Sequence, residues 1–177
     1  LDGVISGTVG NLATAGLSPT TVNFGKFREG TVTSKTQQLT VSNLTTGPGE
    51  GLNASFGAAS GGAGNNGGTI TSLATAASNN TAMSATLNGL ATAGAKSGTQ
   101  TVNFVSDGSF NGGVTTPLPT QVVNLSAEVY RLAVAGGTNA VNLAAKRVGD
   151  AAATGTLTLA NTAAADGFSE GLRGSFG

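Results

Sequence analysis

The sequence contains no cysteine, no histidine and no tryptophan among its 177 residues. Without cysteine there are no disulfide bonds, thiolate metal sites or cysteine nucleophiles. Without histidine the commonest general base and the commonest zinc and copper ligand are missing as well. We therefore expect a protein that is not an enzyme, with no catalytic residue, no metal site and no cofactor.

Charge is also scarce, because only 9% of the residues are charged and eight basic residues balance eight acidic ones. Nucleic acids and anionic membranes attract fields of basic charge, so neither is expected as a partner. No apolar run reaches the roughly 18 residues that a membrane span needs, so we expect no direct membrane insertion. The first residues lack the basic and apolar regions of a signal peptide. Removal of a leader and a start inside a longer protein both remain open.

What the sequence does contain is glycine (29 residues) together with much alanine, threonine, serine and asparagine. The hydrophobic share of 38% is high enough for a folded chain. Cysteine-free, weakly charged compositions of this kind are common among bacterial surface proteins. We therefore expect an extracellular or cell-surface location.

The chain repeats itself at a spacing close to 120 residues. Four blocks recur in the same order, and the spacing drifts by single residues only in Gly/Thr/Ala-rich stretches, where loops absorb such changes. The matched blocks are 5–16 with 125–136, 22–30 with 141–149, 39–43 with 157–161, and 50–57 with 170–177. This order and small drift indicate a true internal repeat.

The repeat divides the chain into three unequal pieces. Residues 1–10 match the closing strand of a repeat, residues 11–130 make one complete repeat, and residues 131–177 match the first part of a second, incomplete one. A unit of about 120 residues is too long for one coil of a solenoid and suits an independent β-sandwich.

Short alternating segments predict the strands of that sandwich. In 123–129 the apolar Val123, Leu125, Ala127 and Val129 alternate with polar residues, which is the period of a half-buried strand. The other predicted strands are 20–24, 39–42, 52–58, 68–73, 83–87 and 100–105, and the predicted turns are 45–51, 61–68, 106–113 and 115–119. About seven short strands predict an all-β chain made of immunoglobulin-like β-sandwiches in tandem, one complete and one incomplete.

The stretch VNFGKFREGTVTSKTQQLTVSN (22–43) combines an apolar-Asn-Phe-Gly strand, a glycine turn and the pattern Gln-x-Leu-x-Val-x-Asn. With its second copy at 141–177, it resembles the choice-of-anchor D repeat of bacterial exported proteins, which is related to the abnormal-spindle and hydin type of immunoglobulin-like domain. The resemblance implies tandem sandwiches in a large secreted or surface-attached protein, with no catalytic residues to carry over. The first copy departs from the pattern with GKFREGT at the usual acidic turn and with a proline-containing loop at 47–50.

Several motifs have simple structural explanations. The Gly-rich stretch 61–68 lacks the GKS/GKT ending of a phosphate loop and precedes no helix, so we interpret it as a loop between strands. Asp107 and Asp166 belong to Asp-Gly pairs, which are typical of turns. Calcium needs several clustered oxygen ligands, and the sequence has no such cluster.

Basic residues recur at matching places in the two copies. Lys146 and Arg147 are adjacent in the second copy, and Lys26 and Arg28 lie in the matching segment of the first, which we interpret as a turn. A repeated basic turn can meet an acidic sugar or a neighbouring subunit, whereas solvated surface charge is the default interpretation.

The predicted core is modest and contains no tryptophan. Its members are Phe24, Phe27, Phe56, Phe104, Leu39, Val41, Met83, Leu87, Val102, Leu125 and Val129. Such a core gains from contact with neighbouring repeats, whose junctions bury further apolar area at about 25 cal/mol per Å². The residues predicted to make these inter-repeat or inter-subunit contacts are Ile5, Val9, Leu132, Val134, Leu157, Leu159, Phe168, Leu172 and Phe176.

The sequence predicts a mechanical function, that of a non-catalytic stalk, surface layer or filament. Its partners would be other copies of itself or neighbouring repeats. The chain begins with the closing strand of one repeat and ends partway through another, and two explanations remain open. Either the chain is part of a longer protein, or the missing strands come from another copy by strand addition, with residues 1–10 as the donated strand. The alternative function is an adhesin-type module that binds a glycan or a surface protein through loops 57–68 and 106–119, where Phe110 is the only aromatic residue of the second loop.

Overall fold

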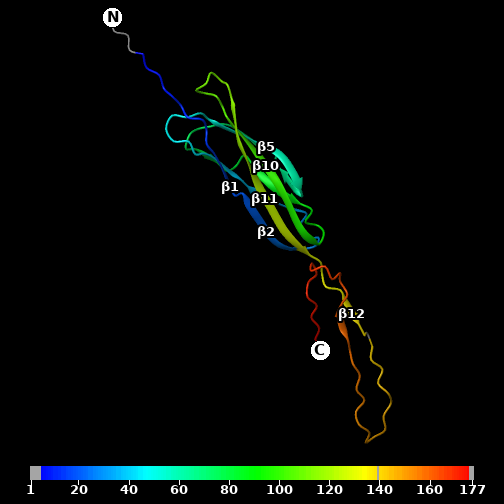
Figure 1. Ribbon diagram of the computed structural model, residues 1–177. Coiled ribbons are helices and arrows are strands. Elements are labelled where there is room, and N and C mark those ends of the chain that lie inside the picture. The colour runs from blue at the N-terminus through cyan, green and yellow to red at the C-terminus, as the bar shows by residue number, and fades with distance from the viewer. Residues whose placement is uncertain (1–4, 139, 176–177) are drawn as a thin grey trace.

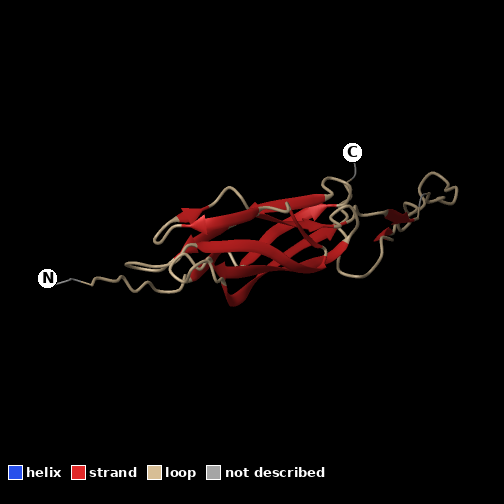
Figure 2. Cartoon of the chain, turned by 90° about the horizontal axis from the view of Figure 1, so that it is seen from above, coloured by secondary structure: helices blue, strands red, loops and turns tan. Residues whose placement is uncertain are grey.

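The computed structural model of the chain describes residues 5–138 and 140–175, and every regular element in these ranges is a β-strand (Figure 1). Most strands belong to two packed layers within residues 11–130, which Figure 2 shows from above. The first layer is a five-stranded sheet in the order β2-β11-β10-β5-β7. Its strands are β2 (Thr21–Arg28), β11 (Thr116–Tyr130), β10 (Gly94–Ser106), β5 (Leu52–Gly61) and β7 (Thr69–Leu73).

The second layer consists of two three-stranded sheets, β1-β4-β8 and β3-β9-β6. Only Leu39 separates β3 from β4, and its N–H donates to the carbonyl of Met83 at 2.9 Å. The two sheets therefore meet along one extended run of chain. The strands are β1 (Ala15–Ser18), β3 (Ser34–Gln38), β4 (Thr40–Asn43), β6 (Ala63–Asn65), β8 (Ser78–Asn79) and β9 (Ser84–Asn88).

The core lies between these layers, where alternate residues of each strand point inward. In β11, Val123, Leu125, Ala127 and Val129 are buried, as their alternation predicts. Eight predicted core residues are buried: Leu39, Val41, Met83, Leu87, Val102, Phe104, Leu125 and Val129. Phe24, Phe27 and Phe56 are half-buried at its margin, whereas Leu52 and Leu90 are fully buried and were not among the predicted core residues.

The second and last strands of this unit, β2 and β11, lie side by side. The chain leaves β1 in the second layer at Ser18, passes through Pro19 and enters the five-stranded sheet as β2. There β2 pairs in parallel with β11, with Val22 opposite Leu125. The predicted fold class is confirmed, because the chain is all-β and residues 11–130 form an immunoglobulin-like sandwich of antiparallel strands closed by this one parallel pair.

Two segments predicted as turns are partly strand. Within 61–68, β5 runs to Gly61 and β6 starts at Ala63, so Gly61 and Gly62 lie where the chain crosses from one layer to the other. Gly61 adopts φ +59, which few other residues tolerate. Within 115–119, β11 begins at Thr116. Its prolines are tolerated because β2 pairs with β11 only from Asn124 onward, which leaves the start of β11 at the sheet edge.

Two further strands, β12 (Ala135–Gly137) and β13 (Leu159–Asn161), form a small separate sheet. Residues 131–175 thereby repeat the beginning of the sandwich, since β12 pairs with β13 as β1 pairs with β4. Three hydrogen bonds recur at matching positions. The Arg131 N–H donates to the Phe168 carbonyl, as the Asn11 N–H donates to the Pro48 carbonyl. The Glu170 N–H donates to the Arg131 carbonyl, as the Glu50 N–H donates to that of Asn11. The Asn161 side-chain amide donates to the Glu170 carbonyl, as that of Asn43 donates to the Glu50 carbonyl. The boundaries at residues 10 and 130 stay predictions.

Candidate assembly surface

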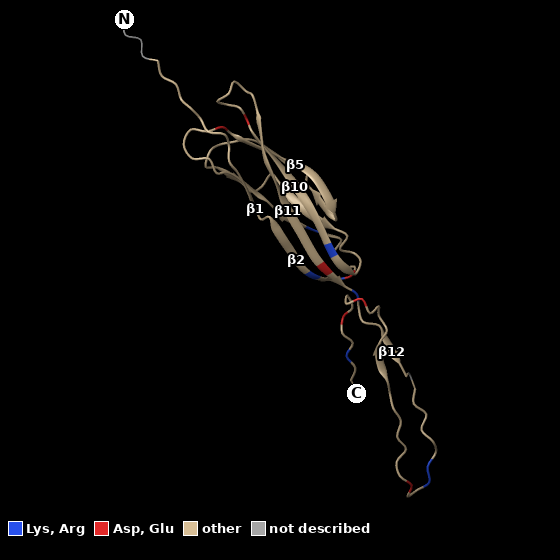
Figure 3. Ribbon diagram, in the orientation of Figure 1, with Lys and Arg blue, Asp and Glu red and all other residues tan. Residues whose placement is uncertain are grey.

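The sandwich continues into the second unit without a linker. Strand β11 ends at Tyr130, and the next residue, Arg131, already makes the backbone hydrogen bonds of the second unit. Charged residues are rare elsewhere and gather at this place (Figure 3). We call it the junction, and define it by Lys26, Arg28, Glu128, Tyr130, Arg131, Asp166, Phe168 and Glu170.

An ion pair connects the two units across the junction. Arg28 on β2 donates from Nε to Glu170 Oε1 at 2.8 Å and from Nη2 to Oε2 at 3.0 Å. Such a bidentate pair fixes the relative orientation of its two side chains more strictly than a single contact does. Since Arg28 belongs to the sandwich and Glu170 to the second unit, the pair constrains the angle between them.

Tyr130 occupies the centre of the junction. Its ring lies 5.8 Å from the ring of Phe168, centroid to centroid, at a tilt of 52°. Its hydroxyl donates to Glu128 at 2.7 Å, and the Lys26 ammonium lies 5.3 Å from the ring centroid. Lys26 also pairs with Glu128 at 3.4 Å. Tyr130 therefore joins the end of the sandwich to an aromatic residue of the second unit.

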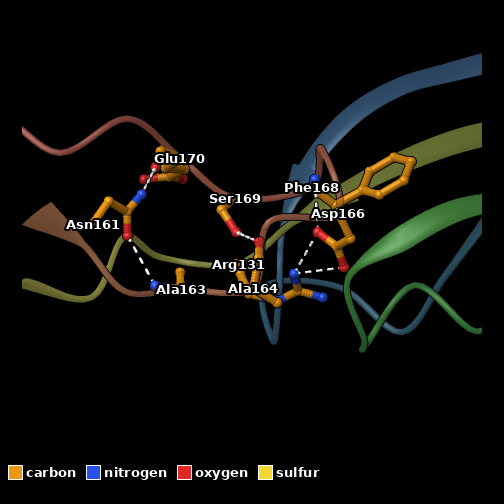
Figure 4. Close-up of polar contacts among 8 residues, drawn as sticks. All are labelled: Arg131, Asn161, Ala163, Ala164, Asp166, Phe168, Ser169 and Glu170. Carbon is orange, nitrogen blue, oxygen red and sulfur yellow. Dashed lines mark hydrogen bonds and ion pairs between the residues drawn. The ribbon is translucent and has the colours of Figure 1, made fainter.

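The second unit is braced internally beside the junction (Figure 4). Arg131 Nη1 donates to both oxygens of Asp166, at 2.6 and 2.7 Å. The Asp166 carboxylate also accepts the backbone N–H of Phe168 at 3.0 Å, so the predicted Asp-Gly turn is confirmed at this position. The Ser169 hydroxyl donates to the Ala164 carbonyl at 2.9 Å. These bonds hold the segment that carries Phe168 and Glu170 toward the sandwich.

The ion pairs lower the pKa values of the junction carboxyls. Hydrogen bonding by Arg28 lowers the pKa of Glu170, and hydrogen bonding by Arg131 lowers the pKa of Asp166. The pKa of Glu128 is lowered by hydrogen bonds from Tyr130 and then from Lys26. All three carboxylates are therefore ionised at neutral pH, and their contacts are present there.

An apolar face on the second unit is about half exposed to solvent. Leu157 is 49% exposed and Leu159 is 54% exposed, whereas their counterparts in the sandwich, Leu39 and Val41, are fully buried. Val141 and Leu143 are exposed as well. We call these four residues the apolar face. Beside Leu157 and Leu159 lies a groove of about 380 Å³ that Ala135, Gly136, Thr138, Thr158, Gly174 and Ser175 also line.

The segment 5–10 at the other end of the chain is exposed too. Ile5 is 99% and Val9 is 92% exposed, although their counterparts Leu125 and Val129 belong to the buried core. The segment forms no strand and extends away from the sandwich (Figure 1). The Phe110 ring lies so close to Gly10 that a Cβ there would come within 2.6 Å of it.

The other predicted contact residues lie in different surroundings. Leu132 and Val134 are exposed at the start of the second unit. Phe168 is half-buried against Tyr130, and Leu172 is half-buried. Phe176 lies outside the described residues. The assignment of this whole set to contacts between repeats or subunits stays a prediction.

Glu128, Tyr130, Arg131 and Glu170 of the junction were not singled out from the sequence. Lys26 and Arg28 were interpreted as a turn, but both lie in strand β2, where they pair with Glu128 and Glu170. The pairing of Arg28 with Glu170 spans 142 positions and leaves no local pattern in the sequence. The available signal was the recurrence of Glu50 as Glu170 at the same place in the repeat.

The remaining polar candidates have structural roles in the sandwich. Burial raises the pKa of Asp107, but hydrogen bonds from Ser109, Ser72 and Gly51 outweigh it and hold that pKa below its usual range. Asp107 thus braces a turn, as predicted. No group of three acidic residues gathers to hold a metal ion in residues 5–138 and 140–175. No described helix is long and apolar enough to cross a membrane.

No family model matches the sequence, and no curated protein is similar to it. Among solved structures, the ASH/PapD-like domain 7 of human CEP192 is similar over 74% of this chain and 95% of that chain, with 11% identity and a TM-score of 0.45. The Vibrio cholerae VesB protease is similar over 67% of this chain, with 12% identity and a TM-score of 0.39. This chain covers only 32% of that protease chain. At such identities and scores these similarities carry no argument about function.

Proposed function

We propose that this chain is a non-catalytic, extracellular structural repeat of a stalk, surface layer or filament. The observation that carries the proposal is the exposure of Leu157 and Leu159, whose counterparts Leu39 and Val41 form the buried core of the sandwich. Apolar side chains at these positions gain free energy when a neighbouring repeat or another copy covers them.

The junction supports a mechanical role. Successive units follow each other without a flexible linker, and Arg28, Tyr130, Phe168 and Glu170 hold them in one relative orientation. Flexible linkers rich in Gly and Ser would instead let the units tumble independently. A stalk or filament needs units held at a defined angle, because only then is the array extended.

Membership of the choice-of-anchor D type of repeat and a cell-surface location belong to the same proposal. Both rest on the strand patterns at 22–43 and 141–177 and on the cysteine-free composition. Assembly between copies would proceed head to tail, by addition of a strand from one copy to the open unit of the next.

Self-association tests the proposal directly. Sedimentation velocity over a concentration series compares the wild-type chain with a Leu157→Ser/Leu159→Ser variant, and negative-stain electron microscopy shows the shape of any assemblies. We expect concentration-dependent, elongated assemblies of the wild type and their loss in the double variant. The control is Leu44→Ser, which removes an equally exposed leucine (58%) from the sandwich. A monomeric wild type, or equal assembly of the double variant, would refute the proposal.

An adhesin-type module is the second candidate, favoured by the exposed Phe110 and Val114 in the loop after β10. An exposed aromatic ring is a common platform for sugars or protein partners. The other predicted binding loop, 57–68, is largely strand and offers less free surface. The Phe110→Ser substitution distinguishes the two candidates. It should abolish ligand binding in an adhesin and leave self-assembly unchanged in a structural repeat.

A further inference from the structure

We infer that residues 5–10 of a second copy add to the second unit as a strand parallel to residues 140–147, with Ile5 opposite Val141 and Ser6 opposite Asn142. This inference rests on the proposed self-assembly and specifies its partner, orientation and register. It uses the pairing already present in the sandwich, where β11 lies parallel to β2.

The register follows from the repeat. In the sandwich, Leu125 lies opposite Val22 and Ser126 opposite Asn23. The counterparts of Leu125 and Ser126 are Ile5 and Ser6, 120 positions earlier. The counterparts of Val22 and Asn23 are Val141 and Asn142, 119 positions later. The two pairs thus define where a donated strand would lie.

The side chains of the donated segment have the required alternation. The inward residues of β11 at these positions are Leu125, Ala127 and Val129, all buried. Their counterparts Ile5, Gly7 and Val9 are small or apolar and alternate with the polar Ser6 and Thr8. A strand with this pattern places its apolar side on the apolar face and its polar side in solvent.

Both partners are unpaired. Residues 140–147 form no strand, although their counterparts in β2 do. Ile5 and Val9 are almost fully exposed. Their pairing would satisfy backbone groups on both sides and bury apolar surface, which is the usual gain of strand addition.

One ion pair of the sandwich has no charged counterpart in the proposed pairing. In the sandwich, Lys26 and Glu128 lie opposite each other and form an ion pair. Their counterparts are Ala145 and Thr8, so both members of the pair are replaced by uncharged residues. The donated strand therefore leaves no lone charge at this place in the new interface.

Residues 5–10 that pair with residues 140–147 must belong to another copy. Segment 5–10 extends from one end of the sandwich and residues 140–147 lie beyond the other end (Figure 1). A chain cannot bring its own two segments together across the folded unit. Donation is therefore head to tail, and such heterologous contacts generate open chains of subunits unless the rotation closes them into a ring.

Engineered cysteines test the register, since the chain has no cysteine of its own. A Ser6→Cys protein is mixed with an Asn142→Cys protein in a thiol-disulfide buffer, and the linked peptides are identified by mass spectrometry. The matched control replaces Asn142→Cys by Ala145→Cys, which lies in the same exposed segment. It is about 10 Å further along the strand, beyond the reach of a disulfide.

We expect the Ser6–Asn142 cross-link to form at least about tenfold more than the Ser6–Ala145 cross-link. Sedimentation of the same mixtures without oxidation tests self-assembly separately from the strand register. Assemblies without the preferred cross-link overturn the strand register but leave the proposed self-assembly standing. A mixture with neither assemblies nor a cross-link overturns both. Equal yields for the two pairs also refute the register, because random collision would produce them.

Discussion

Arg28 and Glu170 lie 142 positions apart in the sequence and form a bidentate ion pair, with N–O distances of 2.8 and 3.0 Å. The pair joins a strand of the sandwich to the unit that follows it. Because the side chains of Arg28 and Glu170 are 55% and 33% exposed, water screens the pair, and its contribution is to orientation more than to stability.

Replacing Glu170→Gln should therefore loosen the junction without unfolding the sandwich. The uncharged amide has a single acceptor oxygen and cannot form the bidentate ion pair, so the second unit should sample a wider range of angles relative to the first. Residual dipolar couplings of the two units measure this range. Glu29→Gln is the matched control, since it removes the same charge one residue from Arg28 and leaves the pair intact. An equal response to both substitutions would assign the effect to net charge.

The junction should also respond to acid. The folded-state pKa values of Glu170, Glu128 and Asp166 lie below their ordinary values, so their contacts are complete above those ordinary values, about 4. The stabilisation is then lost as pH falls through the lowered pKa values. Small-angle scattering between about pH 7 and about pH 2 should show a change in overall shape over this window. A Glu170→Gln/Asp166→Asn variant should show a smaller change, and an identical one would contradict the assignment.

Leu39 and Leu157 occupy matching positions of the repeat, but the first is buried and the second is half exposed. Leu39→Ala removes a fully buried side chain and should lower the free energy of unfolding by about 2–5 kcal/mol. Leu157→Ala, at the matching exposed position, should change it by less than about 0.5 kcal/mol in the monomer. Urea unfolding of dilute protein measures both. A large effect of Leu157→Ala would mean that its side chain is covered in the monomer.

Two buried hydrogen bonds of Ser106 stabilise the sandwich near the end of β10. The Ser106 hydroxyl donates to Glu50 at 2.6 Å and accepts the backbone N–H of Ala13 at 2.8 Å. Ser106→Ala leaves both groups without this partner and should cost about 1–3 kcal/mol of stability in urea unfolding. The control is Ser42, whose hydroxyl lies 2.7 Å from that of Ser78 in a solvent-exposed hydrogen bond. Ser42→Ala should cost less than about 0.5 kcal/mol, and equal costs would show that burial does not matter here.

Limited proteolysis should distinguish the two units. Lys146, Arg147 and Arg173 lie outside strands and are exposed, so trypsin should cut there first. Lys26 and Arg28 lie in β2, and cleavage beside them should be at least about tenfold slower. Mass spectrometry of early time points identifies the cuts. In self-assembled protein, protection at Lys146 and Arg147 should appear, whereas unchanged cleavage would place the contact elsewhere.

The sandwich was largely predictable because its strands have one buried and one exposed face. The alternation around Val123 to Val129 shows this directly, and β11 extends through that segment. The glycines and prolines misled the prediction at 61–68 and 115–119. Gly61 permits a crossing between layers, and Pro117 lies at a sheet edge, so both residues occur where the chain continues as strand.

The junction was not predictable in the same way. Its contacts join residues from β2, from the end of β11 and from the second unit, and each is an ordinary surface residue in its own sequence surroundings. Only the folded arrangement brings Arg28 to Glu170 and Tyr130 to Phe168. The apolar face, by contrast, was predicted in part from the repeat, since Leu157 and Leu159 match the core residues Leu39 and Val41.

The parallel pairing of β2 with β11 determines how the sandwich would carry a load. The chain enters the unit at one end and leaves it at the other, from Tyr130 (Figure 1). Tension between these ends pulls β2 and β11 in opposite directions along their length. The hydrogen bonds between the two strands are then strained together in shear and must fail as a group, whereas strands peeled from one end lose them singly. A unit joined in this way resists stretching along the axis on which its neighbours follow.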